Sequence, residues 1–223
     1  MTDLKNWTAR PLPERKALEG TYVRLEPLDA TRHGDGLFAA SSVPDADQRF
    51  TWLGNLYPPK SRSEYQRWLE EAAASQDPFF FTLIDRAGGA VGGYQALMRP
   101  DPANGVIEIG YIYWGPLIAR TRLATEAFYL FARYIFDELG YRRYEWKCHN
   151  ENEPSKRAAQ RFGFQFEGIF RQHMVAKGKN RDTAWFSILD TEWPALRRAY
   201  EAWLAPDNFD ADGKQKKRLE ELR

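Results

Sequence analysis

Hydrophobic positions along the chain change repeatedly between the spacing of helices and that of strands. Residues 123–139 place apolar side chains on one face of a helix with about 3.6 residues per turn. An apolar run follows at 144–148, and then a polar break at 149–153. Pro154 and Ser155 stand where another helix would begin, and Gly163 would end it. Strand and helix therefore alternate here, as in an open α/β sheet.

The rest of the chain gives a coarser pattern of elements. Strands are predicted at residues 21–25, 79–84, 91–98 and 106–114, and helices after Asp29, at 61–75 and at 194–204. Residues 44–60 are predicted to be a loop. We expect an irregular arm at 1–19, one domain at 20–205, and a polar, mobile tail at 206–223.

Several short motifs in order resemble the acetyl-coenzyme A-binding core of the GNAT superfamily, in its RimJ/RimL-like branch. They are IEIGYIYW at 107–114, ATEA at 124–127, ELGYRR at 138–143, NEPS at 152–155 and RFGFQFEGIFRQ at 161–172. The opening LEGTYVRLEPLDA at 18–30 also resembles the first strand and turn of that branch. The resemblance implies a mixed, mostly antiparallel sheet of about seven strands, flanked by helices and splayed between the fourth and fifth strands.

The same resemblance implies an N-acetyltransferase that uses acetyl-coenzyme A as co-substrate. The acetyl group would pass by direct attack to a primary amine, either a protein N-terminus or a small molecule. Two other functions are compatible with the fold: a non-catalytic module that binds coenzyme A or senses a small molecule, and a transferase for a larger acyl group.

The coenzyme pyrophosphate is expected at a helix N-terminus, whose free N–H groups bind anions. The candidates there are Arg120, Thr121, Arg122, Leu123, Ala124 and Thr125. Arg122 replaces a glycine of the family pattern, and only the final alanine of that pattern matches. Arg120 and Arg122 are expected to contact phosphate. The alternative is that both are solvated arginines of the first turn.

The resemblance implies that the fourth predicted strand, 106–114, holds the pantetheine arm through backbone groups at Gly110, Tyr111 and Ile112, which would also polarise the thioester carbonyl. Strand alternation puts Glu108, Gly110 and Ile112 on one face and Ile109, Tyr111 and Tyr113 on the other. Asn152 would bind the pantetheine amide or cap the loop.

Three residues are candidates for proton transfer. Glu108 is expected among apolar neighbours, where burial would raise its pKa towards that of a general base; the alternative is an ion-paired or solvent-facing glutamate. His173 titrates near neutrality and is the second candidate base; alternation places it with Arg171 on one face. Ser155 is the candidate acid in the resemblance, or an ordinary helix cap. Cys148 is expected in the core.

The acceptor pocket should lie opposite the coenzyme, lined by the first helices and the predicted hairpin at 173–185. The candidate substrate-binding residues are Trp52, Tyr57, Arg181, Asp182 and Trp185. Arg181 and Asp182 could instead form an ion pair that closes the turn, which would contribute little to stability.

Composition excludes several other partners. Lysine and arginine (32) nearly balance aspartate and glutamate (31), so bulk charge favours neither nucleic acid nor an acidic membrane. The sequence shows no apolar run of roughly 20 residues and no signal peptide, so a cytoplasmic location is expected. The one cysteine cannot form an internal disulfide, and no metal is expected. A homodimer is compatible with the resemblance.

Overall fold

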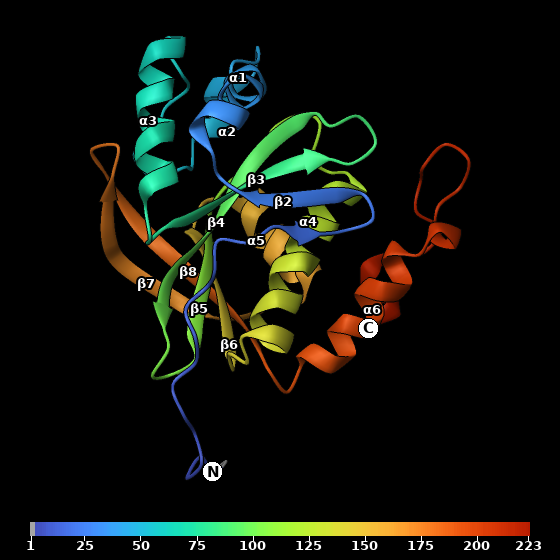
Figure 1. Ribbon diagram of the computed structural model, residues 1–223. Coiled ribbons are helices and arrows are strands. Elements are labelled where there is room, and N and C mark those ends of the chain that lie inside the picture. The colour runs from blue at the N-terminus through green and yellow to red at the C-terminus, as the bar shows by residue number, and fades with distance from the viewer. Residues whose placement is uncertain (1–2) are drawn as a thin grey trace.

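The computed structural model describes residues 3–223, which form one mixed sheet between two layers of helices (Figure 1). The strands are β1 (Leu18–Glu19), β2 (Val23–Pro27), β3 (Phe79–Asp85), β4 (Val91–Asp101), β5 (Val106–Trp114), β6 (Arg143–His149), β7 (Gln165–Ala176) and β8 (Lys179–Leu189). The α-helices are α1 (Ala30–Ser41), α2 (Ala46–Phe50), α3 (Arg62–Ala74), α4 (Arg122–Arg133), α5 (Glu153–Phe162) and α6 (Trp193–Leu204).

The eight-stranded sheet has the order β1-β2-β3-β4-β5-β6-β8-β7. Only β5 and β6 pair in parallel; all other neighbouring strands among residues 3–223 are antiparallel. The predicted mixed, mostly antiparallel sheet is thus confirmed. The count exceeds the expected seven because β1, only two residues long, pairs with β2 at Leu18 and Leu25.

Each face of the sheet packs on its own apolar cluster. On one face, Leu37 of α1 and Leu69 of α3 pack with Phe80 and Tyr94 of the sheet. On the other face a larger cluster unites α4, α5 and α6 with the sheet and centres on fully buried Phe128. The fold is therefore a three-layer arrangement, α/β/α, with its hydrophobic cores on opposite faces of the sheet (Figure 1).

Local sequence signals fix most element boundaries. The Asp29 carboxylate accepts hydrogen bonds from the first turn of α1, and the Ser61 hydroxyl accepts one from Glu64 N at the start of α3. Gly163 ends α5 with φ +98°, a conformation that favours glycine. These boundaries confirm the predicted helices.

A buried carboxylate ties α4 to the edge of the sheet. Glu126, in the ATEA motif, accepts hydrogen bonds from the backbone N–H groups of Thr21, Tyr22 and Val23 at 2.6, 2.6 and 2.7 Å. Three donors satisfy a charge that would otherwise be costly to bury. The motif therefore positions α4 against β2.

Three predictions about the fold need correction. The expected loop at 44–60 contains the short helix α2, because Phe50 packs into the core. The helix predicted at 123–139 changes from α to π geometry over Tyr134–Glu138. The C-terminal tail is not wholly solvated, since Leu219 of the 3₁₀ turn Leu219–Leu222 is fully buried in the cluster that includes α6.

No helix within residues 3–223 combines the length and the apolar character that crossing a bilayer requires.

Candidate active site

A cleft opens where β5 and β6 separate. The two strands pair from Val106 and Arg143 as far as Ile109 and Trp146, and no pair continues beyond that point. This confirms the predicted splay. The cleft has a volume of about 1000 Å³ and is lined by residues of β5, β6, α5, the α2 region and the β7–β8 hairpin. Its position allows an extended ligand to reach the middle of the sheet.

A bulge in β5 produces the opening. Tyr111 has φ +47°, which is unusual for a residue other than glycine, and the register with β4 shifts between Gly110 and Tyr113. The predicted alternation is therefore wrong beyond Gly110. Ile109 packs into the cluster around α4, whereas Tyr113 packs into the cluster on the opposite face. Gly110, Tyr111 and Ile112 all line the cleft, so backbone at the bulge is available to a ligand.

One wall of the cleft is built by the start of α5. Asn152 is the helix cap, because its Oδ1 accepts a hydrogen bond from Ser155 N at 3.2 Å. The Ser155 hydroxyl accepts a hydrogen bond from Trp146 Nε1 at 3.0 Å. An indole nitrogen can only donate, so the Ser155 hydroxyl keeps its own hydrogen to donate, and the Cys148 sulfur is one acceptor within its reach. The cap role foreseen for Ser155 belongs to Asn152.

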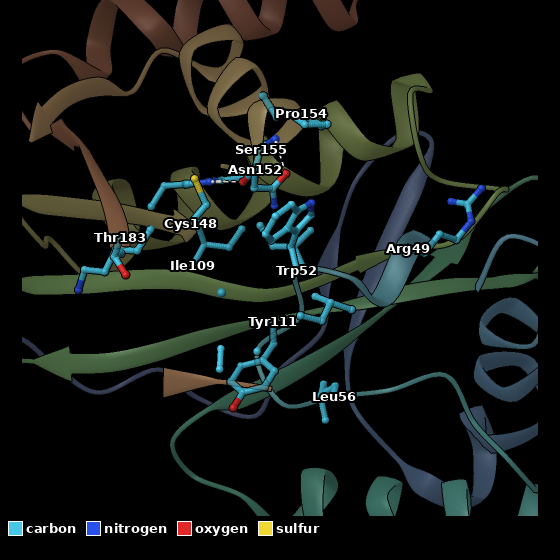
Figure 2. A pocket seen from close by; sticks show the side chains of 18 of the residues that line it. Arg49, Trp52, Leu56, Ile109, Tyr111, Cys148, Asn152, Pro154, Ser155 and Thr183 are labelled. Atoms are coloured by element: carbon cyan, nitrogen blue, oxygen red, sulfur yellow. Dashed lines mark hydrogen bonds between the residues drawn. The ribbon is translucent and has the colours of Figure 1, made fainter. Parts of the chain in front are cut away.

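Figure 2 shows this wall from within the cleft. Cys148, Asn152 and Ser155 lie on one side, Tyr111 and Leu56 lie on the other, and Trp52 projects between them. Cys148 is buried in the core as predicted, and burial raises the pKa of its thiol.

The α4 N-terminus differs from the expectation. Thr121 caps the helix, its Oγ1 accepting from Leu123 N at 3.2 Å. Arg122 lies over the ring of Tyr22, with Cζ 4.2 Å from the ring centroid, and does not line the cleft. Thr125 is buried and accepts a hydrogen bond from Arg161. Ala124 is core and Leu123 packs against it. Of this predicted set, only Arg120 lines the cleft.

The other wall carries charge rather than the apolar surroundings expected for Glu108. Glu108 is 4% exposed, and its carboxylate is 2.7 Å from Arg99 Nη1 and 2.9 Å from Lys147 Nζ. Lys147 Nζ also lies 2.8 Å from Glu145. Burial raises the pKa of Glu108, and Lys147 and Arg99 oppose that rise. The ion-paired alternative for Glu108 is confirmed.

His173 lines the cleft from β7. Its Nδ1 lies 3.0 Å from the Thr183 hydroxyl, which is buried. A bulge at Gln172, with φ +50°, brings both His173 and Met174 to the cleft, so the predicted strand alternation is wrong there. Partial burial, followed by the charges of Arg181, Arg99 and Lys147, lowers the pKa of His173. The imidazole is therefore neutral at pH 7 and able to accept a proton.

The predicted acceptor residues separate into two groups. Trp52 and Arg181 line the cleft, and the Trp52 ring lies 4.7 Å from that of His149. Tyr57, Asp182 and Trp185 do not line it. Tyr57 contacts Lys177, and Asp182 accepts hydrogen bonds from Gln172 N and Asn180 in the hairpin. Trp185 lies under Lys147, with Nζ 3.7 Å from its centroid. No ion pair joins Arg181 to Asp182.

Sequence reasoning missed other residues that line the cleft: Arg49, Met98, Arg99, Trp146 and Lys147. Arg49 forms a two-atom ion pair with Asp45 and donates to the Trp114 carbonyl at 3.3 Å. Lys147 carried one signal, a cation within the otherwise largely apolar run at 144–148. The others depend on bulges and helix placement that no local pattern reports.

Comparisons with known proteins agree with this geometry. The family model described as an acetyltransferase (GNAT) domain matches residues 23–165. A crystal structure of a GCN5-related N-acetyltransferase from Brucella melitensis has 70% identity and a TM-score of 0.97, over 98% of this chain and 99% of that one.

A curated relative and a second solved structure are more distant. An uncharacterized N-acetyltransferase, p20, of Bacillus licheniformis is 33% identical over 51% of this chain and 63% of its own length. RimL, a ribosomal L7/L12 alpha-N-protein acetyltransferase, shares the fold at 16% identity, with a TM-score of 0.67 over 78% of this chain and 94% of that one. The chain belongs to the RimJ/RimL-type family of GNAT acetyltransferases and is an acetyl-coenzyme A-dependent N-acetyltransferase.

Proposed function

We propose that the cleft between β5 and β6 transfers the acetyl group directly to a primary amine, on a protein N-terminus or a small molecule. The observation that carries this proposal is the separation of β5 from β6 after Ile109 and Trp146, with Ser155 at one wall and His173 at the other. Acetyl-coenzyme A fits between these walls, with its thioester beside the bulge at Tyr111. Backbone N–H groups there would stabilise the charge that develops on the carbonyl oxygen.

His173 is the proposed base. In the reaction, the neutral amine attacks the thioester carbon, a C–N bond forms, the C–S bond breaks, and the nitrogen loses a proton to the imidazole. The lowered pKa of His173 keeps the ring unprotonated at neutral pH. The Glu108 carboxylate is occupied by its ion pairs with Lys147 and Arg99, and it is assigned the role of fixing these two cations at the wall.

Ser155 is the proposed proton donor to the departing sulfur. Its oxygen accepts from Trp146 Nε1, which leaves its own hydrogen to donate either to the Cys148 sulfur or to a sulfur that enters the cleft. The donated hydrogen bond would stabilise the thiolate as it leaves. If the Ser155 proton passes to the sulfur, solvent returns a proton to the serine oxygen. The Cys148 thiol is a poor nucleophile in the resting enzyme, because burial raises its pKa.

Direct attack can be tested without knowing the acceptor. The protein is incubated with radiolabelled acetyl-coenzyme A alone, denatured, and measured for covalent label and intact mass. We expect reversible binding and no acetylated protein. Stoichiometric acetyl label that is lost in a Cys148→Ala or Ser155→Ala variant would contradict the proposal, because it would place a covalent intermediate on the path. The release of coenzyme A thiol is then measured with a panel of amines and peptides as acceptors.

A further inference from the structure

An arginine without a partner stands at the charged wall of the cleft. Arg181 is half-buried, and its Nε is buried without a hydrogen-bond partner in residues 3–223. Within that range no ion pair joins its guanidinium to a carboxylate, although it lines the cleft. A half-buried guanidinium that lines a cleft and has no carboxylate partner can bind an anion that enters the cleft.

The other cations near Arg181 all have carboxylate partners. Arg99 and Lys147 are held by Glu108, and Lys147 also by Glu145. The remaining cation nearby, Arg143, pairs with Glu145 at 2.7 Å and with Glu167 at 2.5 Å. Each other cation of this wall is therefore paired, and Arg181 alone leaves an excess of positive charge among the described residues.

Arg181 shares a face of β8 with Thr183. Along β8, Ala184 is buried in the cluster around α4, so alternation turns Arg181 and Thr183 towards the opposite face. Thr183 contacts His173, the proposed base. Arg181 also lies close enough to His173 to lower the imidazole pKa. An amine held for attack near His173 would therefore bring its substituents within reach of Arg181.

We propose that the acceptor is an amine that also carries a carboxylate, and that Arg181 binds this carboxylate. The inference rests on the proposed function and names its substrate class. A guanidinium is suited to paired hydrogen bonds with a carboxylate. The same unpaired positive charge disfavours polycationic acceptors.

Matched acceptor pairs test the proposal. One pair is the peptide amides Asp-Ala-Ala and Asn-Ala-Ala, and the other is β-alanine and β-alaninamide. The wild type should favour the anionic member of at least one pair by about tenfold or more in kcat/KM, equivalent to about 1.4 kcal/mol. A preference in the peptide pair points to an acidic N-terminus, and a preference in the small pair points to a free amino acid. Equal or better use of the neutral members would overturn the inference.

Variants separate recognition from folding and from coenzyme binding. Arg181→Gln should remove the preference for the anionic member, measured as the ratio of the two kcat/KM values within each pair, and Arg181→Lys should restore part of it. The matched control is Arg120→Gln, at the other end of the cleft, which should keep the preference. A preference that survives in Arg181→Gln would contradict the assignment.

Calorimetry with the same probes and protein saturated with coenzyme A reports binding even without turnover. Arg181-dependent binding of the anionic probes, with no acetylation of any probe, would uphold the inference and count against the proposed function. Acetylation of neutral probes with no preference for anionic ones would support the proposed function and overturn the inference about Arg181. Anionic probes that bind no better than neutral ones would overturn the inference in this assay also.

Discussion

The two walls of the cleft are built in different ways. The α5 wall is formed by neutral groups, Trp146, Cys148, Asn152 and Ser155, each placed by a strand or a helix cap close in sequence. The opposite wall carries ion pairs between residues of β4, β5 and β6, with Arg181 of β8, unpaired within residues 3–223, beside them. The difference between the walls suggests two roles. The neutral wall suits the thioester and its sulfur, and the charged wall suits selection and deprotonation of the acceptor.

The largest expected effect comes from removing the centre of the charged wall. Lys147→Met leaves Glu108 and Glu145 buried with fewer partners, so the free energy of unfolding at pH 7 should fall by about 3 kcal/mol. Protonation of Glu108 removes part of the uncompensated charge, so the difference in unfolding free energy between Lys147→Met and the wild type should become smaller as pH falls. Denaturant unfolding at several pH values measures it.

The matched control is Lys156→Met, which removes an i,i+3 pair with the exposed Glu153 on α5. Such a pair contributes little, and the change should be within about 0.5 kcal/mol. If Lys147→Met cost no more than this control, the charged wall would not be an energetic unit.

Ser155→Ala tests the neutral wall. The loss of a positioned proton donor should lower kcat about 100-fold with the affinity for acetyl-coenzyme A unchanged. Trp146→Phe, which removes only the Nε1 donor, should cost roughly fivefold. Steady-state kinetics and calorimetry separate the two parameters. Ser63→Ala, an exposed serine near the start of α3, is the control, and a loss of less than about threefold in Ser155→Ala would assign the serine a structural role.

The arginines near the start of α4 should differ in their effect on coenzyme affinity. Arg120 lines the cleft, so Arg120→Ala should raise the Kd for acetyl-coenzyme A about tenfold. Arg122 is stacked on Tyr22, so Arg122→Ala should change the Kd for acetyl-coenzyme A by less than about twofold. Calorimetric titration of both variants decides this. Equal weakening would show that both arginines reach the phosphates, as the sequence alone predicts.

The smallest effect is the titration of His173. The protein has three histidines, so loss of one NMR signal in His173→Gln identifies its resonance. Its pKa should lie below the usual value of about 6.5, so the ring stays neutral at pH 7 and protonates only at lower pH. Arg181→Gln removes a nearby cation and should raise that pKa, whereas Arg133→Gln, a variant on α4, should not. A pKa above 6.5 in the wild type would contradict the arrangement.

Sequence patterns predicted the neutral wall better than the charged one for a physical reason. A helix cap or a glycine C-cap depends on a few adjacent residues, so the starts of α1, α3 and α5 and the end at Gly163 could be read directly. Alternation failed at Tyr111 and Gln172, where bulges with positive φ shift the register. A single extra residue in a strand reverses every later side chain, and no local signal marks where this happens.

Long-range pairs were the second source of error. The sequence predicted apolar surroundings for Glu108 because its neighbours in the chain are isoleucines. In the structure it pairs instead with Arg99, whose backbone is distorted with φ +48°, and with Lys147 on the parallel strand. Arg122 looked like a phosphate ligand because it begins α4, but it stacks on Tyr22 in the turn between β1 and β2. The motif order was enough for the family, whereas the chemistry of the acceptor wall required the structure.

A crystal structure of the protein with acetyl-coenzyme A would show directly where the thioester lies. We expect a thioester carbonyl within hydrogen-bond distance of backbone N–H groups at Tyr111 and Ile112, a sulfur beside the Ser155 hydroxyl, and open space between the acetyl group and Arg181. A coenzyme bound with its thioester outside the gap between β5 and β6, or a coenzyme phosphate paired with Arg181, would contradict it.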